Sequence, residues 1–267
     1  MTDNPTSPTG RRRKRIPQLL RQTEKITVLT AYDGAIAPIL EAGGVDALLI
    51  GDSIGNVSLG YASTLPVTLE DIERATAAVE RTTTTPLIIA DLPFGSFEES
   101  HAQAFASSAR LMKVGAQTVK VEGARPDLVR HLTSNGIPVM GHLGYTPQAE
   151  HLLGGPSLQG VDAKGEQLLA DAVALAEAGA WSVVLEMVPA QLAAQITAVV
   201  PTIGIGAGPD CDGQVLVWSD MAGLTAWSPS FAKRFAEMGE YLREATAAYV
   251  EETRAGTFPG PKQTRER

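Results

Sequence analysis

The chain has 267 residues, of which 44% are hydrophobic and 19% charged, a composition typical of a globular protein with a sizeable core. One α/β barrel is commonly of this length. The formal net charge of −8 argues against a nucleic-acid partner, because nucleic-acid phosphates select basic surfaces. A single cysteine, Cys211, excludes an internal disulfide and a cysteine-based metal site, so we expect a reducing, cytoplasmic location.

Both ends of the chain are expected to be loose. Residues 1–15 are rich in Pro, Thr and Arg and lack apolar periodicity, which predicts a disordered basic tail, and residues 261–267 resemble them. The cluster Arg11–Arg15 could contact RNA or an anionic surface, but a solubilising tail is the simpler interpretation. No long apolar stretch follows it, so no signal peptide is predicted. The charge-free run 187–209 contains internal prolines and is interpreted as strand–helix–strand, not as a membrane span.

Residues 16–260 alternate short apolar runs with longer helical patterns, and we expect one catalytic domain that ends in a C-terminal helix. The apolar runs are continuous, as in strands buried on both faces of a parallel sheet. The eight expected strands cover residues 26–33, 47–53, 86–93, 117–123, 137–144, 182–189, 201–208 and 214–220.

Helical patterns fill the segments between these strands. Thr68 and Asp71 have the spacing of a capping box. The apolar face of the helix that follows is expected to comprise Ile72, Ala75 and Val79. The next helix shows a similar repeat, formed by Ala102, Phe105, Ala109 and Met112.

Three helix-to-strand junctions have nearly the same sequence: EAGGVDALLIGD, KVGAQTVKVE and EAGAWSVVLE. In each, a glycine ends the helix and an apolar strand follows that ends in an acidic residue. Such repetition is typical of stacked βα units, and eight strands with interleaved helices predict a closed (β/α)₈ TIM barrel. The alternative is an open doubly wound sheet. No expected strand, however, is followed by the G-x-G-x-x-G turn of that fold, and the glycine run 204–208 lacks its spacing.

Polar residues gather where the expected strands end. They are, in chain order, Asp52, Ser53, Asp91, Lys120, Glu122, His142 and Glu186. In a barrel these C-terminal strand ends converge on one mouth, where the active site lies. One acid after an apolar run is usually a helix cap or turn former. Four acids, however, would crowd like charges into a poorly hydrated cavity unless a cation were bound.

Carboxylates without a cysteine cluster favour a hard, oxygen-preferring ion, so we expect Mg²⁺ before Zn²⁺. Mg²⁺ leaves coordination positions that a 2-oxo acid could fill through its keto and carboxylate oxygens. Polarisation of the ketone would acidify the adjacent C–H and stabilise an enolate, and a carboxylate away from the metal could accept the proton. The residues therefore predict metal-assisted enolisation without naming a substrate.

Lys120, Ser53 and His142, and also Tyr32, allow alternative interpretations. Lys120 and Glu122 are two apart on one strand and share a face, so the lysine could neutralise a substrate carboxylate or form an ion pair at the barrel rim. Ser53 could hold an oxyanion, cap a helix, or do both. His142 could contact the substrate or support a ligand from behind, or it could be a buried histidine satisfied by backbone. Tyr32, at the end of the first expected strand, could reach the substrate or be a core aromatic.

Eight motifs occur in series: TAYD (30–33), GDSIG (51–55), TLPVT (64–68), ADLPF (90–94), VKVEG (119–123), GHLG (141–144), LEMVP (185–189) and GIGAG (204–208). With their spacing, they make residues 20–260 strongly resemble the ketopantoate hydroxymethyltransferase (3-methyl-2-oxobutanoate hydroxymethyltransferase) family. The resemblance implies a (β/α)₈ barrel of the phosphoenolpyruvate/pyruvate-binding type, often assembled as a homodecamer.

The resemblance also implies an activity. Members of that family transfer a hydroxymethyl group from 5,10-methylenetetrahydrofolate to 3-methyl-2-oxobutanoate in pantothenate biosynthesis, forming 2-dehydropantoate and tetrahydrofolate through a Mg²⁺-stabilised enolate. The implied Mg²⁺ ligands are Asp52, Asp91 and Glu122. The implied substrate contacts are Asp52, Ser53, Asp91 and Lys120. Glu186 is the implied proton acceptor, and small molecules and other copies of the chain are the expected partners, with no nucleic acid and no membrane.

Two other functions compete with this interpretation. A C–C lyase or mutase of the phosphoenolpyruvate mutase and isocitrate lyase type would also use Mg²⁺, oxo acids and a related barrel. Those enzymes usually carry a different acidic cluster, and the lyases a reactive cysteine loop, whereas Cys211 follows the glycine run here. A scaffold or RNA-binding protein that uses Arg11–Arg15 would leave the strand-end carboxylates without a role.

Overall fold

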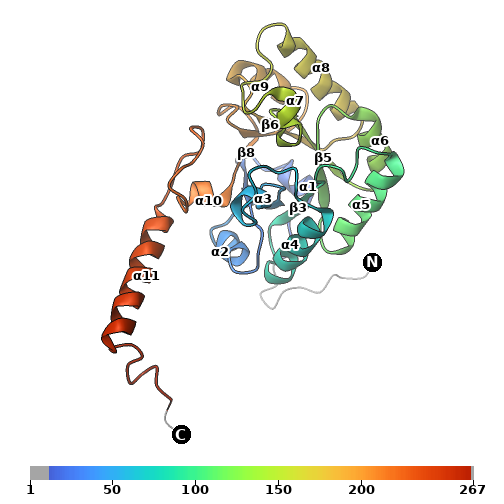
Figure 1. Cartoon of the computed structure of the whole chain (residues 1–267). Coiled ribbons are helices and arrows are strands. Elements are labelled where there is room, and N and C mark those ends of the chain that lie inside the picture. Colours follow the sequence, from blue (N-terminus) through green and yellow to red (C-terminus); the bar gives the residue numbers. More distant parts are fainter. Residues whose placement is uncertain (1–11, 266–267) are drawn as a thin grey trace. The chain divides into compact units, whose positions relative to one another are not determined.

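Eight parallel strands close into a barrel in the computed structural model, which describes residues 12–265 (Figure 1). Neighbours in the chain are neighbours in the barrel, and the last strand pairs with the first. The strands are β1 (Ile26–Thr30), β2 (Ala47–Ile50), β3 (Leu87–Asp91), β4 (Thr118–Glu122), β5 (Val139–Gly144), β6 (Ser182–Glu186), β7 (Thr202–Ile205) and β8 (Gly213–Leu216). The closed barrel predicted from the apolar runs is confirmed, and the open sheet is excluded.

Helices connect consecutive strands, with one exception, and others precede the first strand or follow the last. They are α1 (Ile16–Leu19), α2 (Ala37–Ala42), α3 (Ile54–Val57), α4 (Leu69–Thr82), α5 (His101–Lys113), α6 (Pro126–Ser134), the 3₁₀ helix η1 (Pro147–Ala149), α7 (Glu150–Leu153), α8 (Lys164–Glu177), α9 (Ala190–Thr197), α10 (Trp218–Met221) and α11 (Met238–Ala255). β7 and β8 are joined by residues 206–212, all of them described, and this segment contains no helix. The expected alternation of strands and helices is therefore interrupted at this point.

The start of α4 follows the predicted capping box. Thr68 Oγ1 accepts a hydrogen bond from the Asp71 backbone N–H at 3.2 Å, and the Asp71 carboxylate accepts one from the Thr68 backbone N–H at 3.0 Å. These bonds satisfy N–H groups that a helix start leaves unpaired. The predicted apolar face, which comprises Ile72, Ala75 and Val79, is buried.

The predicted face of α5 is wrong. Its buried residues are Ala104, Ser107, Ser108 and Leu111, whereas Phe105 is exposed. The two serines are buried without leaving their hydroxyls unpaired, because Ser107 Oγ donates to the Ser96 carbonyl and Ser108 Oγ to the Ala104 carbonyl, each at 2.7 Å. A search for apolar residues at helical spacing therefore selects a different side of this helix.

The three similar junctions adopt the same conformation. Gly44, Gly115 and Gly179 lie shortly after the ends of α2, α5 and α8 and have φ values of 91°, 118° and 98°. Residues other than glycine avoid this left-handed region, so glycine ends each helix and turns the chain into the next strand. The prediction that glycine stops these helices is confirmed.

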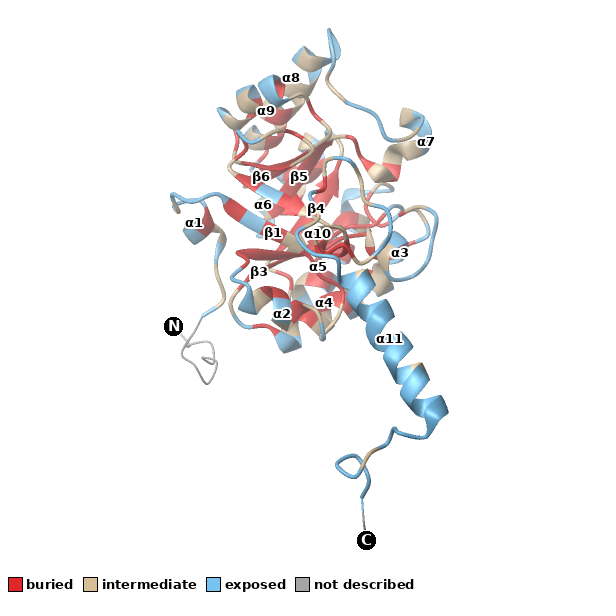
Figure 2. Cartoon of the chain, turned by 90° about the vertical axis from the view of Figure 1, so that its left-hand side faces the viewer, coloured by how far each residue is buried: buried red, intermediate tan, exposed pale blue. Residues whose placement is uncertain are grey.

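The core lies inside and around the barrel, where buried residues concentrate (Figure 2). Leu19 of α1 packs with inward-facing residues of the strands, among them Ile26, Val28 and Leu87. Since Ile26 begins β1 and Leu87 begins β3, α1 covers the end of the barrel where the strands start. The opposite end, where the strands finish, is the mouth.

Residues just before α1 contact this closed end of the barrel. Arg13 donates hydrogen bonds to the carbonyl oxygens of Thr83, at 2.7 Å, and Pro86, at 2.9 Å. Lys14 forms an ion pair with Asp46, which precedes β2. These two residues fall within the stretch we predicted as a disordered tail, and their contacts hold residues 13 and 14 against the barrel. Arg11 and the residues before it lie outside the described residues.

The chain divides into two compact units, one that ends at Val217 and one that begins at Trp218. The first unit holds the whole barrel. The second holds α10 and α11, and α11 is the C-terminal helix we predicted, so the division falls within the stretch expected to form one domain. Of the helices within residues 12–265, none combines the length and the apolar character that crossing a membrane requires.

Candidate active site at the mouth of the barrel

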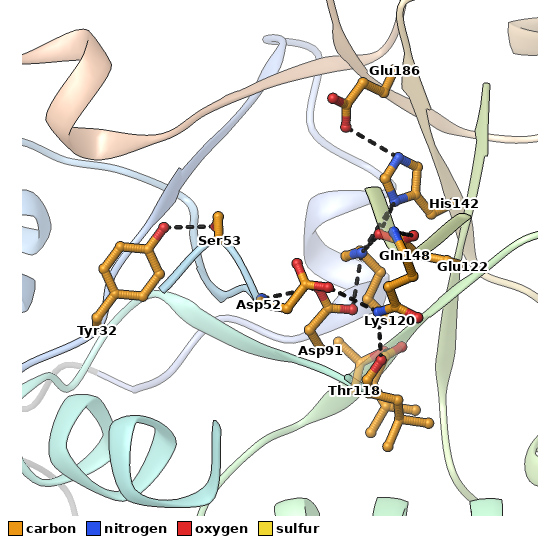
Figure 3. Close-up of polar contacts among 12 residues, drawn as sticks. Tyr32, Asp52, Ser53, Asp91, Thr118, Lys120, Glu122, His142, Gln148 and Glu186 are labelled. Carbon is orange, nitrogen blue, oxygen red and sulfur yellow. Dashed lines mark hydrogen bonds and ion pairs between the residues drawn. The ribbon is translucent and has the colours of Figure 1, made fainter. Parts of the chain in front are cut away.

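Three buried carboxylates meet at the mouth of the barrel (Figure 3). Asp91 and Glu122 are the last residues of β3 and β4, and Asp52 follows β2 by two residues. One ligand oxygen from each lies within 4.8 Å of the other two. Their relative exposures are 4% for Asp52, 1% for Asp91 and 4% for Glu122, so water screens their charges very little.

Strand register brings the other polar residues to the same place. Asp91 is paired with Lys120 across β3 and β4, and Glu122 with His142 across β4 and β5. Paired residues on parallel strands project side by side, so each of these pairs is adjacent at the mouth. Continuous apolar runs that end in polar residues therefore build a site once the barrel closes.

Lys120 lies among the carboxylates. Its Nζ is 2.9 Å from Asp91 Oδ1 and 3.3 Å from Glu122 Oε1, and the lysine is as buried as its partners. Burial by itself would lower the pKa of Lys120, but the negative charges of Asp91, Glu122 and Asp52 raise it above its ordinary value. The side chain is therefore a permanent cation inside the mouth, not at an exposed rim.

One lysine does not balance three carboxylates. Burial, with the charges of Asp91 and Glu122, raises the pKa of Asp52 well above its usual range. The pKa of Asp91 is also raised, by burial and by Glu122, although Lys120 opposes the shift. A divalent cation would relieve this repulsion, and an all-oxygen donor set suits Mg²⁺ or another hard ion. The residues present therefore fit a metal of that class.

His142 lies between two carboxylates. Its Nδ1 is 3.2 Å from Glu122 Oε1, and its Nε2 is 3.3 Å from Glu186 Oε2 (Figure 3). Burial and Lys120, whose Nζ is 3.1 Å from Nδ1, act to lower the pKa of His142, but Glu122 and Glu186 raise it to about 9. Both ring nitrogens of His142 thus face acidic side chains. A cation on Glu122 would oppose the upward shift.

The ends of β5 and β6 are in close contact beside His142. Gly144, the last residue of β5, has a φ of 92°, and a Cβ there would lie 2.1 Å from the Glu186 carbonyl oxygen. The same oxygen accepts a hydrogen bond from the Tyr145 N–H at 2.8 Å. Only glycine allows the two strands to approach this closely. Glu186 is therefore anchored by its own backbone next to the strand that carries His142.

Ser53 and Tyr32 form a separate pair at the mouth. The Tyr32 hydroxyl lies 2.7 Å from Ser53 Oγ, and Figure 3 shows the pair on the Asp52 side of the carboxylates. Ser53 occupies the N-cap position of α3, but its side chain makes no capping bond. Its hydroxyl is oriented by Tyr32 instead.

Gln148 joins the site and was missed by the sequence analysis. Its backbone N–H donates to Glu122 Oε2 at 3.0 Å, and its Nε2 donates to Asp52 Oδ2 and to the Leu92 carbonyl, both at 2.9 Å. The residue lies in η1, six positions after His142, where no strand-end pattern points to it. The signal available was the TPQ sequence (146–148), one residue after GHLG. Gln148 links two of the three carboxylates directly.

Comparison with known proteins gives a consistent result. Residues 12–261 match the family model described as ketopantoate hydroxymethyltransferase. A relative named 3-methyl-2-oxobutanoate hydroxymethyltransferase, from Rhodococcus jostii (strain RHA1), is 50% identical over 247 residues that cover 90% of this chain and 86% of the relative. A relative of the same name from Thermobifida fusca (strain YX) is 52% identical over 242 residues, covering 88% and 86%.

Solved structures with a similar barrel are more distant in sequence. A phosphoenolpyruvate phosphomutase from Streptomyces platensis subsp. rosaceus has a TM-score of 0.61 at 12% identity, over 90% of this chain and 87% of that one. A 2,3-dimethylmalate lyase of the PEP mutase/isocitrate lyase superfamily has a TM-score of 0.59 at 16% identity, over 94% and 90%. At these identities the likeness concerns the fold alone.

Proposed function

The chain belongs to the ketopantoate hydroxymethyltransferase family, and on that premise we propose that it transfers a hydroxymethyl group from 5,10-methylenetetrahydrofolate to 3-methyl-2-oxobutanoate. The products are 2-dehydropantoate and tetrahydrofolate, and the reaction belongs to pantothenate biosynthesis. The observation that carries the proposal is a cluster of three buried carboxylates with a fourth, Glu186, held apart from it by His142. A cluster for a metal beside a separate base is what enolisation of a 2-oxo acid requires.

Asp52, Asp91 and Glu122 would hold the metal, which we propose is Mg²⁺. When bound, Mg²⁺ supplies positive charge that polarises the keto group and acidifies the C–H at C3 of the oxo acid. Gln148 orients two of the ligands through its hydrogen bonds to Asp52 and Glu122. Such outer contacts fix the direction of a carboxylate before the metal arrives.

Lys120 and Ser53 would position the oxo acid, together with Asp52 and Asp91. The Lys120 ammonium is held beside Asp91 and pairs with the substrate carboxylate, which offsets negative charge in a site that already holds three acids. The Ser53 hydroxyl, oriented by Tyr32, can donate to a substrate oxygen. Tyr32 thus acts through Ser53, as a positioning residue.

Glu186 would accept the proton from C3. The electron pair left at C3 forms the new bond to the one-carbon unit, whose two bonds to N5 and N10 of the folate break. Water supplies the oxygen of the hydroxymethyl group, and the proton from C3 and one proton from water end on the two folate nitrogens. His142 Nε2, 3.3 Å from Glu186 Oε2, would attract this carboxylate as an imidazolium and keep it oriented. Because Glu186 is outside the metal cluster, its lone pairs are not taken by the cation.

The competing functions receive less support. Cys211 is fully buried and lies two residues before the start of β8, at the end of the barrel opposite the carboxylates, so it does not provide a reactive thiol at the mouth. Burial also raises the pKa of its thiol. Among the basic residues proposed for RNA binding, Arg13 and Lys14 contact the barrel instead.

A cytoplasmic homodecamer remains part of the proposal. Within the second unit, α11 has no buried residue and exposes large apolar side chains, namely Tyr241, Leu242 and Tyr249. Apolar surface of this kind supports self-association, while the number of subunits rests on the family resemblance.

The direct test is an assay of the purified chain with 3-methyl-2-oxobutanoate, 5,10-methylenetetrahydrofolate and Mg²⁺. We expect 2-dehydropantoate to form and expect its formation to stop when the metal is chelated. Absence of product under conditions in which an established family member is active would refute the proposed function.

A further inference from the structure

A cavity of about 350 Å³ adjoins the carboxylate cluster and has no role in the chemistry described so far. Glu122 and Gln148 form part of its wall. The remaining wall comes from segments that follow β2, β3, β4 and β5, so the whole cavity lies on the mouth side of the barrel. Loops at this end of a (β/α)₈ barrel bind the substrates.

The wall is largely apolar and partly aromatic. Leu65, Phe94, Phe97 and Leu152 contribute to it, and Phe94 and Leu152 are exposed although they are large and hydrophobic. A pocket of this size, with an apolar wall and a few polar groups, is typical of small-molecule sites. Exposed apolar side chains beside an active site indicate a surface that binds a hydrophobic part of a ligand.

Two charged side chains complete the wall. The guanidinium of Arg125 stacks over the Phe97 ring, 5.2 Å from its centroid, which fixes its position. The Glu98 carboxylate accepts hydrogen bonds from the backbone N–H groups of Gly95, at 2.9 Å, and Phe97, at 3.1 Å. Away from Glu122, the cavity therefore offers a cation and an acceptor, each held in place, on an apolar surface.

The second substrate of the proposed reaction has matching chemistry. A reduced folate carries a flat bicyclic pterin with N–H donors on one edge, an aromatic linker and a glutamate tail with carboxylates. Its one-carbon unit must reach an oxo acid held at Glu122. Another cavity, of about 380 Å³, is lined by Lys25, Ile26 and Asp212 near the starts of β1 and β8, at the far end of the barrel, and cannot deliver carbon to the mouth.

We propose that the cavity beside Glu122 binds the folate donor, with Glu98 accepting from the pterin N–H edge and Arg125 pairing with the glutamate tail. The aromatic parts of the donor pack on Phe94, Leu65 and Leu152. This assignment rests on the proposed function and deepens it, because it names the residues that recognise the donor.

Binding measurements with two probes test the assignment. Tetrahydrofolate has both the pterin and the tail, whereas 6-methyltetrahydropterin has only the pterin. In the full chain with Mg²⁺ and 3-methyl-2-oxobutanoate present, Glu98→Gln is expected to weaken binding of both probes about tenfold, the worth of one charge-assisted hydrogen bond. Arg125→Ala is expected to weaken the binding of tetrahydrofolate about fivefold, the upper range for an exposed ion pair. It should not cause a matching loss of affinity for 6-methyltetrahydropterin, which lacks the tail.

The chain offers matched controls. Glu99→Gln changes the neighbouring exposed acid, and Arg130→Ala changes an exposed arginine on the same helix segment that does not line the cavity. Both control variants should bind tetrahydrofolate within about twofold of the parent chain, as is usual for surface substitutions. Thermal unfolding of all four variants checks that each is folded.

The outcomes separate this assignment from the proposed function. Parental affinity for tetrahydrofolate in both Glu98→Gln and Arg125→Ala overturns the assignment, even if the parent chain forms 2-dehydropantoate. Equal losses for both probes in Arg125→Ala overturn the tail contact. A parent chain that forms no product refutes the proposed function. Binding of tetrahydrofolate and 6-methyltetrahydropterin is measured without turnover, so it tests the assignment separately. No binding of either probe by the parent chain overturns the assignment itself.

Discussion

Nε2 of His142 lies 3.3 Å from Oε2 of Glu186, and the opposite ring nitrogen lies 3.2 Å from Glu122. One imidazole therefore connects the proposed base to a proposed metal ligand. It does so because β5 runs between β4 and β6 in the barrel, with each strand in register with its neighbour. Changes at the cluster and at the base are coupled through this ring.

Replacing His142 tests its positioning role. In His142→Gln one amide replaces a ring that reaches both carboxylates, so Glu186 loses its fixed orientation. We expect the rate of C3 deuterium exchange in 3-methyl-2-oxobutanoate, measured by NMR without folate, to fall about 10- to 100-fold. The oxo-acid KM should change much less than kcat. His131→Gln, at a histidine on α6, serves as control, and a kcat equal to that of the control would rule out the positioning role.

Glu186 itself is tested by the same exchange reaction. Glu186→Gln retains the size of the side chain and removes the proton acceptor, so we expect exchange to fall by at least about a hundredfold. Metal-dependent binding of the oxo acid, measured by calorimetry, should persist because Glu186 is outside the cluster. Glu177→Gln on α8 is the matched control. Exchange at the parental rate in Glu186→Gln would remove this residue from the base role.

Gln148 is expected to support metal affinity. Gln148→Leu removes the hydrogen bonds from Nε2 to Asp52 and to the Leu92 carbonyl but retains the backbone bond to Glu122. We expect Mg²⁺ affinity to fall about 10- to 100-fold, as for other residues that orient metal ligands. Since a ligand of the folded state raises the unfolding temperature, the measurement is Tm against Mg²⁺ concentration. Gln167→Leu, on α8, is the matched control. If Mg²⁺ raises the Tm of Gln148→Leu as much as that of Gln167→Leu, the prediction is contradicted.

At the closed end of the barrel, Asp46 is expected to make stability depend on pH. Burial alone would raise the pKa of Asp46, but hydrogen bonds from Lys14, Thr27 and Gln22 lower it below its usual value. A lowered carboxyl pKa stabilises the fold above the unfolded-state pKa, and this stabilisation is lost as pH falls through the folded-state pKa. Asp46→Asn should therefore reduce the free energy of unfolding by about 1–3 kcal/mol at neutral pH.

Urea unfolding over a range of pH checks this prediction. The difference between the parent chain and Asp46→Asn should shrink as pH falls below about 4, where the carboxyl is protonated in the unfolded chain. Asp171→Asn, on the surface of α8, controls for the loss of one negative charge. A difference that stays constant down to acid pH would show that charge on Asp46 does not stabilise the fold.

Much of the fold and the cluster could be predicted because both depend on local sequence patterns. Continuous apolar runs marked the strands, and barrel closure then required their polar ends to meet. The buried face of α5 was not predictable in this way, because Ser107 and Ser108 become compatible with the core only through hydrogen bonds to particular carbonyls. Gln148 was missed for a related reason, since its partners come from β2 and β4, remote in sequence.

Gly144 has a consequence for the spacing of His142 and Glu186. The Glu186 carbonyl oxygen occupies the place where a side chain at position 144 would begin. The distance between the ends of β5 and β6 is therefore set by main-chain packing. The spacing of the two strands that carry His142 and Glu186 is then a property of the barrel wall. Any change at position 144 would therefore move the main chain of the proposed base and not only a side chain beside it.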